Sequence, residues 1–305
     1  MRLGVLDVGS NTVHLQIFDT FPGSRPSPIS NCKVEIRLAE YVSSDGLVSA
    51  EGIRRLRAAI SECIQESQKS DPSEILAFAT SALRESKNGN DIIARINSEF
   101  ELDLQVLSGE EEASITFLAA RRWHGWSSGR LLMIDIGGGS LEIAMGVNES
   151  PDLALSLPLG ALRLTKGFLV DDPFSKKSIN QLRDHIDEVL EENLPVLLKS
   201  QHADLVIGTS KTLRTIARVA SDWLGGDIDH IQLDRLTRMI PKLADMTELE
   251  RAELPGVSKT RARQIVAGAI VAESVMKKLG NKELRICPWA LREGIILKWL
   301  DWIRG

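Results

Sequence analysis

The chain has 305 residues, of which 43% are hydrophobic and 26% are charged, with 23 glycines and 11 prolines. These values are near the averages of folded domains and exclude extended disorder, while the length suggests two domains at roughly 150 residues per domain. The net charge of -5 disfavours broad binding to nucleic acid or to anionic membranes, so we expect neither partner.

The three cysteines, Cys32, Cys63 and Cys287, are odd in number and form no CxxC pair. They therefore support neither a disulfide framework nor a thiolate zinc site. Asp7 precedes any apolar signal-peptide core, and Glu273 interrupts the most apolar later stretch, residues 265–276. These features predict a cytoplasmic protein without a membrane-spanning segment.

The predicted elements of the first half begin with a β-hairpin over residues 3–19, LGVLDVGSNTVHLQIFD. The alternation of KVEIRLAE predicts a third strand at 33–40, and Ser49 is then a candidate N-cap of a helix with apolar residues at helical spacing. The later segments of this half are strand 74–80, a helix over about 91–100, strand 102–107 and a helix from 110 to about 122.

The second half repeats this plan at an offset of 128 residues, since LLMIDIGGGSLEIAMGV at 131–147 is a second predicted hairpin. The later segments are strand 153–159, a helix near 175–193, strand 204–208, a helix from 210, further helices to 279 and strand 283–287. Alternating strands and helices predict an α/β fold with a largely parallel sheet. The stretch 123–129, WHGWSSG, is the best candidate for a hinge between the halves.

Both hairpins contain a turn whose composition suits phosphate. Glycines let backbone N–H groups approach an anion closely, and hydroxyl or amide side chains add donors. The candidate donors are Gly9, Ser10, Asn11 and Thr12 in the first turn and Gly137, Gly138, Gly139 and Ser140 in the second. Hairpin closure alone explains either turn, but it does not require the Asp that ends the preceding strand in both repeats.

Those two carboxylates, Asp7 and Asp135, are hard oxygen ligands suited to Mg²⁺. The alternative is an Asx-turn, in which each carboxylate accepts hydrogen bonds from its own turn. Both interpretations can hold for one residue.

Three consecutive glutamates open the helix predicted from residue 110. Ser108 and Glu111 fit a capping box, which explains one carboxylate without catalysis. Glu112 instead lies at helical spacing from Ile115 and Ala119 and heads the stripe that faces the interior. A carboxylate in that position needs a partner or a function.

Taken together, the motifs resemble the exopolyphosphatase and guanosine pentaphosphate phosphohydrolase family of the actin and sugar-kinase superfamily. The resemblance runs through 7–15, 36–53, 78–88, 107–113, 135–143, 156–165 and 291–297 in order. The stretches 208–218 and 287–294 look most like short actinobacterial members.

This resemblance implies two ribonuclease-H-like domains, 1–126 and 127–305, with an interdomain cleft, and a C-terminal helix at 289–303 that packs back on the first domain. It also implies removal of a terminal phosphate with Mg²⁺ or Mn²⁺ as cofactor. By the same resemblance, the phosphate-binding loops are 7–12 and 135–140, the catalytic carboxylate is Glu112, and further phosphate contacts come from Thr80, Ser81 and Arg84.

The sequence thus predicts an exopolyphosphatase that hydrolyses the terminal phosphoanhydride of inorganic polyphosphate. The alternatives are a guanosine pentaphosphate phosphohydrolase and a non-catalytic sensor of polyphosphate or guanosine polyphosphates. A phosphotransferase is a weaker alternative, because GTSKT at 208–212 stands where nucleotide-using relatives have a Gly-Gly turn. Longer relatives continue beyond the position of Gly305, from which we expect a preference for short polyphosphates, unless a homodimer extends the substrate path.

Overall fold

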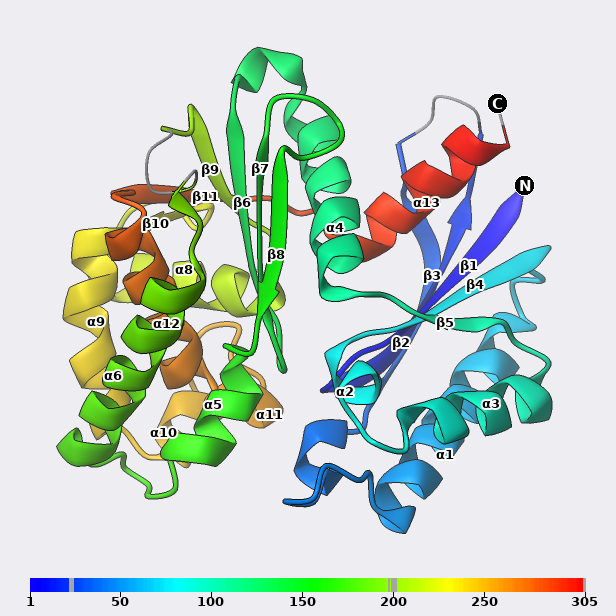
Figure 1. Ribbon diagram of the computed structural model, residues 1–305, viewed down its shortest axis with the longest axis horizontal. Coiled ribbons are helices and arrows are strands. Elements are labelled where there is room, and N and C mark those ends of the chain that lie inside the picture. The colour runs from blue at the N-terminus through cyan, green and yellow to red at the C-terminus, as the bar shows by residue number, and fades with distance from the viewer. Residues whose placement is uncertain (22–24, 197, 199–201, 304–305) are drawn as a thin grey trace. The chain divides into compact units, whose positions relative to one another are not determined.

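A computed structural model describes residues 1–21, 25–196, 198 and 202–303 of the chain. The chain forms two compact units, residues 1–115 with 291–305, and residues 116–290 (Figure 1). The boundary between Ile115 and Thr116 lies inside helix α4 (Gly109–His124), whereas the sequence placed it after residue 126. Helix α13 (Leu291–Trp302) belongs to the first unit although it ends the chain.

The first unit is built on a five-stranded sheet in the order β3-β2-β1-β4-β5. Its elements besides α4 and α13 are β1 (Arg2–Val8), β2 (Thr12–Asp19), β3 (Pro28–Glu35), η1 (Leu38–Tyr41), α1 (Ala50–Ser67), β4 (Glu74–Ala79), α2 (Ser81–Arg84), α3 (Gly89–Phe100) and β5 (Leu104–Val106). Successive side chains of a strand face opposite sides. Leu6 and Val8 of β1 therefore pack in the cluster that includes α1 and α3, while Leu3 and Val5 pack with α13. Within this unit, Figure 1 shows α13 on one side of the sheet and α1 and α3 on the other.

The predicted third strand at 33–40 is wrong over most of its length, because β3 ends at Glu35. Arg37 adopts a positive φ of 47°, which is incompatible with continuing a strand. The amides of Ile36 and Arg37 both donate to the carbonyl oxygen of Asn11, at 2.9 and 3.0 Å. The chain after β3 is therefore bound to the first glycine-containing turn, and η1 follows.

The second unit contains a six-stranded sheet in the order β10-β11-β9-β6-β7-β8. Its strands are β6 (Leu131–Ile136), β7 (Leu141–Gly146), β8 (Leu153–Leu157), β9 (Leu205–Gly208), β10 (His230–Gln232) and β11 (Glu283–Ile286). The helices formed by its described residues, besides the end of α4, are η2 (Trp126–Ser128), α5 (Ala161–Phe168), α6 (Lys176–Asn193), α8 (Lys211–Leu224), α9 (Leu233–Asp245), α10 (Glu248–Ala252), α11 (Lys259–Ala262) and α12 (Ile265–Lys278). Helix α12 is buried from Ile265 to Met276 and packs against α5, α6, α8 and α9.

The prediction of a largely parallel sheet is wrong, because both sheets are mixed. The pairs β1–β2 and β6–β7 are antiparallel, as are β2–β3 and β7–β8. A short turn can join only antiparallel neighbours, so each hairpin fixes this pairing. Of the strands reached through helices, β4, β5, β9 and β11 pair in parallel with β1, β4, β6 and β9, respectively. The edge strand β10 instead pairs antiparallel with β11.

The segment 123–129, predicted as a hinge, is held to the second unit by Arg121. This side chain is fully buried and donates to the carbonyl oxygens of Gly125, Gly129 and Gly146 at 3.2, 2.8 and 2.8 Å, and to Ser128 Oγ at 3.0 Å. A buried guanidinium keeps these acceptors because losing them would leave a charged group unsatisfied. The segment is thus an ordered part of this unit.

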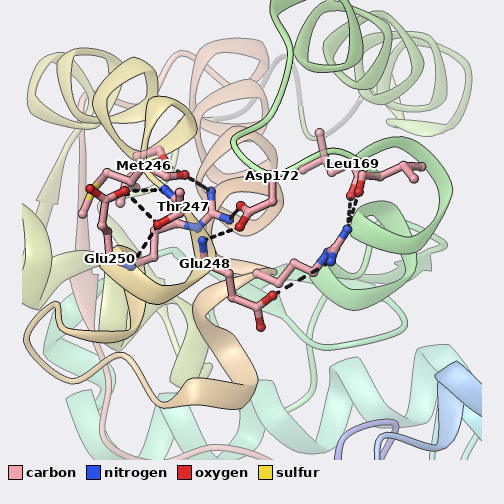
Figure 2. Close-up of polar contacts among 10 residues, drawn as sticks. Leu169, Asp172, Met246, Thr247, Glu248 and Glu250 are labelled. Atoms are coloured by element: carbon pink, nitrogen blue, oxygen red, sulfur yellow. Dashed lines mark hydrogen bonds and ion pairs between the residues drawn. The ribbon is translucent and has the colours of Figure 1, made fainter.

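A second buried arginine, Arg251, joins α10 to the chain after α5. Its guanidinium donates to Asp172 Oδ1 at 2.7 Å and to the carbonyl oxygen of Met246 at 3.0 Å, and it lies 4.2 Å from the centre of the Phe174 ring. Figure 2 shows the same carboxylate facing the start of α10, where its other oxygen accepts the Glu248 amide at 2.8 Å. Burial lowers the pKa of Arg251, and the Asp172 carboxylate opposes that effect.

None of the helices that the structure describes has both the length and the apolar composition required to cross a bilayer.

Candidate active site

The turn at 137–140 is shaped by the first residues of α5. The amide of Ala161 donates to the Gly137 carbonyl oxygen at 3.0 Å, and the amides of Leu162 and Arg163 donate to that of Gly138, each at 3.0 Å. The Nε of Arg163 donates to the Gly139 carbonyl oxygen at 2.8 Å. Amides of the first helical turn have no partner inside the helix, so α5 uses three of them to bind two carbonyls of the turn, and the Arg163 side chain binds the third.

This arrangement orients the amides of the same turn. In a planar trans peptide the C=O of one residue and the N–H of the next point in opposite directions. Because the carbonyls of Gly137, Gly138 and Gly139 are directed at α5, the N–H groups of Gly138, Gly139 and Ser140 point away from it. Successive amides directed to one side form a nest that binds anions.

The close contact between α5 and the turn depends on Gly160. A Cβ at this position would lie 2.2 Å from the carbonyl carbon of Gly139 and 2.3 Å from the Ser140 nitrogen. Its backbone is extended, with φ -72° and ψ 144°, so close approach rather than conformation requires the glycine. The nest is thus a product of two segments.

Asp135 lies at the end of β6, immediately before this turn. Its Oδ2 accepts a hydrogen bond from Thr209 Oγ1 at 2.5 Å. Directly across the strand pair, in register with Asp135, lies Glu142 of β7, which is 2% exposed and accepts from Ser156 Oγ at 2.8 Å. Cross-strand partners lie on the same face of a sheet, so two carboxylates occupy one side of the β6–β7 pair.

The turn of the first unit, at 9–12, is closed by a hydrogen bond from the Gly9 amide to the Thr12 carbonyl oxygen at 3.0 Å. The Oγ atoms of Ser10 and Ser81 lie 3.0 Å apart, and both side chains are buried. The Thr80 amide donates to the Val8 carbonyl oxygen at 3.2 Å. The structure therefore brings the predicted residues Ser10, Thr80 and Ser81 to the end of β1.

Glu112 and Arg84, predicted for catalysis and for phosphate binding, form an ion pair in this unit. The Nη1 of Arg84 donates to Glu112 Oε2 at 2.9 Å and to the Leu107 carbonyl oxygen at 3.0 Å. The predicted capping box is confirmed, since Glu111 accepts the Ser108 amide at 2.8 Å and its own amide donates to Ser108 Oγ at 3.1 Å. The two adjacent glutamates thus differ: Glu111 caps α4, and Glu112 lies against a guanidinium.

Asp7 also contacts an arginine, Arg292 at the start of α13. The guanidinium donates from Nη1 to Asp7 Oδ2 at 3.0 Å and from Nε to Gln16 Oε1 at 2.7 Å. Burial raises the pKa of Asp7, and Arg292 counteracts this rise by stabilising the ionised carboxylate. Residues almost a whole chain length apart meet here because α13 returns to the first unit.

Comparison with known proteins establishes the family. The Ppx/GppA phosphatase family matches residues 16–302. The chain is a member of the Ppx/GppA phosphatase family. Exopolyphosphatase 1 of Mycobacterium tuberculosis is 48% identical to it over 305 residues, 99% of this chain and 89% of that protein, and Exopolyphosphatase 1 of Mycobacterium leprae is 46% identical over 99% of this chain and 90% of that protein.

Solved structures of Ppx/GppA proteins share the fold. An exopolyphosphatase from Cytophaga hutchinsonii superposes with a TM-score of 0.88 at 26% identity, over 99% of this chain and 98% of that one. The Aquifex aeolicus member of the family superposes with a TM-score of 0.82 at 22% identity, over 100% of this chain and 99% of that one. The fold is therefore the α/β fold of the actin and sugar-kinase superfamily, as predicted.

The donors of this Ppx/GppA protein suit a divalent ion bound through few carboxylates. The described residues contain no group of three or more His, Cys, Asp or Glu side chains arranged to hold a metal. Mg²⁺ commonly binds through one or two carboxylates, with substrate phosphate and water as the other ligands. Asp135 and Glu142 provide such a pair, whereas an oxygen of Asp7 already binds a guanidinium, whose positive charge opposes a second cation nearby.

Sequence reasoning assigned no role to Arg292, Glu142 or Thr209. For Glu142 a signal exists, because a glutamate between Leu141 and Ile143 in an apolar strand is a charge placed in a core. Arg292 and Thr209 have no comparable signal. They reach Asp7 and Asp135 through tertiary contacts over sequence separations of 285 and 74 residues.

Proposed function

We propose that this chain is an exopolyphosphatase, which hydrolyses the terminal phosphoanhydride of inorganic polyphosphate and releases orthophosphate. The observation that carries the proposal is the nest at Gly138, Gly139 and Ser140, whose amides are directed away from α5 because α5 binds the carbonyls. Such donors bind phosphate oxygens without requiring a sugar or a base. The names of the mycobacterial relatives support the same substrate.

In the reaction, the oxygen of a water attacks the terminal phosphorus while the bond from that phosphorus to the bridging oxygen breaks. The remaining chain leaves with the electron pair of that bond. Glu112 accepts a hydrogen bond or a proton from the water, and its ion pair with Arg84 fixes the orientation of the carboxylate. Arg84 has further guanidinium donors for a phosphate oxygen.

Each turn binds phosphate in this proposal. In the second unit, the amides of the nest and the hydroxyl of Ser140 donate to phosphate oxygens. In the first unit, Ser10, Asn11 and Thr12 do so, and Thr80 and Ser81 add hydroxyl groups. The amide of Gly9 instead closes the turn that positions these donors. These donors stabilise the negative charge that spreads over the phosphoryl oxygens and the leaving chain in the transition state.

Asp135, with Glu142 beside it, is the proposed ligand of Mg²⁺, or of Mn²⁺ in its place, in the second unit. Asp7, in the first unit, is the weaker of the two predicted ligands because its carboxylate already accepts a hydrogen bond from Arg292. When bound, the ion neutralises negative charge on the phosphate oxygens. Thr209 orients Asp135 through its hydrogen bond, and Ser156 does the same for Glu142.

The test is orthophosphate release from short polyphosphate, long polyphosphate, guanosine pentaphosphate and ATP, each with Mg²⁺, with Mn²⁺ and with a chelator. We expect release from polyphosphate that requires the divalent ion and exceeds release from ATP. A kcat/KM for guanosine pentaphosphate larger than that for polyphosphate would contradict the proposal and would identify the chain as a guanosine pentaphosphate phosphohydrolase. Tight binding of polyphosphate without release of phosphate would contradict the proposal and would indicate a non-catalytic sensor.

We also propose that the protein acts in the cytoplasm. The three cysteines, all within the described part of the chain, form no disulfide in the structure, which is the usual state in a reducing compartment.

A further inference from the structure

Two cysteines of the first unit, far from each other in sequence, lie in contact. The Sγ atoms of Cys32 in β3 and Cys63 in α1 are 3.3 Å apart, and the Cys63 thiol is directed at Cys32. Cys32 is half-buried, whereas Cys63 is fully buried. Neither residue takes part in the proposed active site, so the pair has no role in the reaction described above.

We propose that Cys32 and Cys63 form an oxidation site, at which a peroxide converts the two thiols into a reversible disulfide that joins β3 to α1. A disulfide has an S–S bond of about 2.05 Å, so the sulfurs must approach by about 1.2 Å from their 3.3 Å separation. Small rotations about the two χ1 angles provide a movement of this size. The proposal does not depend on the enzymatic function.

The order of the two steps follows from exposure. Cys32 is half-buried rather than fully buried, so its thiol is the one that meets the oxidant. After losing its proton to solvent, the thiolate attacks one oxygen of hydrogen peroxide, and the O–O bond breaks. The sulfur is oxidised to sulfenic acid, and the other oxygen leaves as hydroxide, which takes up the released proton and becomes water. The sulfur of Cys63 then attacks the Cys32 sulfur, and the S–O bond breaks. The hydroxide leaves with the proton of Cys63 as a second water.

Cys63 is suited to the second step rather than the first. Burial raises the pKa of its thiol, so it is a poor thiolate and does not compete for the oxidant. Its proton is already directed toward Cys32, where the departing hydroxide appears. Because the sulfurs are held in contact, the second step is effectively unimolecular and precedes further oxidation of Cys32.

The bond would attach an edge strand to the core. β3 is the last strand of its sheet and is hydrogen-bonded on one side, to β2, where Cys32 is in register with Leu15. Helix α1 packs against both strands. A disulfide between residues 32 and 63 closes a loop in the unfolded chain and prevents β3 from separating from α1, so it stabilises the first unit.

The experiment begins with reduced protein freed of reductant and treated with hydrogen peroxide. We expect the number of free thiols in the denatured chain to fall from three to one and return to three with dithiothreitol. Tryptic digestion without reduction should yield a cross-link between the peptide ending at Lys33 and the peptide 58–69. The melting temperature should rise by roughly 5 °C or more on oxidation.

Cys32→Ser is the main variant, because its partly exposed side chain is replaced by one of similar size. We expect it to keep both remaining thiols, to form no cross-link and to melt at the same temperature before and after peroxide. Cys63→Ala should behave in the same way, whereas Cys287→Ala should oxidise like the unmodified chain. Three free thiols after peroxide would overturn the proposal, as would a sulfinic acid at Cys32 beside a free Cys63, or a bridge to Cys287.

Discussion

Two buried arginines of this protein and the half-buried Glu112 are each held by oppositely charged groups or by several carbonyl oxygens. Arg121 is bound by backbone carbonyls, Arg251 by Asp172 and two carbonyls, and Glu112 by Arg84. Arg121 and Arg251 have structural roles, because each keeps a segment of the second unit in place. Glu112 differs in retaining partial exposure, with 14% of its side chain accessible, and a carboxylate that acts on water must be reached by water.

We predict that Glu112→Gln binds polyphosphate but loses kcat by about 10² to 10⁴, the range expected for a positioned acid or base. Glu111→Gln is the matched control, because it removes a cap of α4 and should lower the free energy of unfolding by no more than about 1 kcal/mol. Phosphate release and polyphosphate binding measured on both variants decide the point. Loss of activity in Glu111→Gln alone would reverse the assignment.

Glu273 provides a prediction about pH. It is 1% exposed and accepts hydrogen bonds from Lys277 at 2.8 Å, Thr237 at 2.7 Å and Arg183. Burial acts to raise the pKa of Glu273, but these hydrogen bonds outweigh it, so its pKa lies below the ordinary value. The stabilisation it provides is therefore present above the pKa of an unfolded glutamate, about 4.3, and is lost as the pH falls through the pKa of the folded state.

We expect Glu273→Gln to lower the free energy of unfolding by about 2 kcal/mol at pH 7. This loss is smaller than that for breaking a fully buried ion pair, because Arg183 and Lys277 can turn toward water when the carboxylate is removed. The difference from the unmodified chain should shrink as the pH is lowered below about 4. Urea unfolding of both proteins at a series of pH values measures this difference in the free energy of unfolding. Lys277→Ala is the control, and we expect it to change the free energy of unfolding only slightly. A difference that grows toward acid pH would contradict the prediction.

At the scale of elements, the second phosphate turn depends on α5. The turn's sequence permits many conformations because it contains three glycines, and the donors of α5 select one of them by binding three carbonyls. A short helix thus orients the amides of a neighbouring loop. Damage to the contact between α5 and the turn should therefore affect activity without touching a residue that contacts substrate.

Gly160→Ala tests this dependence, because the new Cβ would overlap backbone atoms of Gly139 and Ser140. We expect kcat/KM for polyphosphate to fall by about 10², since a shift of 1 Å at a catalytic group has an effect of that size. Gly167→Ala is the control in the same helix: nothing lies within 4 Å of its Cβ position, and alanine should stabilise the helix by about 0.5–1 kcal/mol. Normal activity in a folded Gly160→Ala protein would refute the role of α5.

For the whole molecule, the net charge of -5 limits how a polyanion is bound. The net negative charge repels a long polyphosphate at a distance, whereas the donors of the two turns and local basic groups attract it. Binding should therefore rely on directed hydrogen bonds at a few phosphates rather than on a broad basic surface.

We predict a modest dependence of KM on salt. A polyanion that loses two or three counterions on binding weakens by about tenfold between 50 and 200 mM salt, whereas 6–10 phosphate contacts would weaken it by about 10³ to 10⁵. KM for long-chain polyphosphate at several KCl concentrations, with short-chain polyphosphate as the control, measures the slope. A salt dependence of KM as steep as that expected for 6–10 phosphate contacts would contradict the prediction and would indicate an extended basic surface that binds the chain.

The sequence was sufficient wherever a signal is local. The two hairpins, the cap of α1 by Ser49 and the capping box of α4 follow from periodicity and from residues within four positions of each other. The repetition of the hairpin and its turn was likewise recognisable, because the aspartates and glycines recur at the same spacing in both halves. Local patterns of this kind survive in an extended chain, so they can be recognised without the fold.

The tertiary structure decided which of these residues act on one another. The strand predicted through residue 40 ends at Glu35 because the carbonyl of Asn11, some 25 residues earlier, binds the amides that would have continued it. Arg292 reaches Asp7 because α13 folds back on the first sheet, and the glycine turn is oriented by α5. Each contact joins segments whose separation in the chain carries no periodic signal, so burial and packing, rather than local preference, determine it.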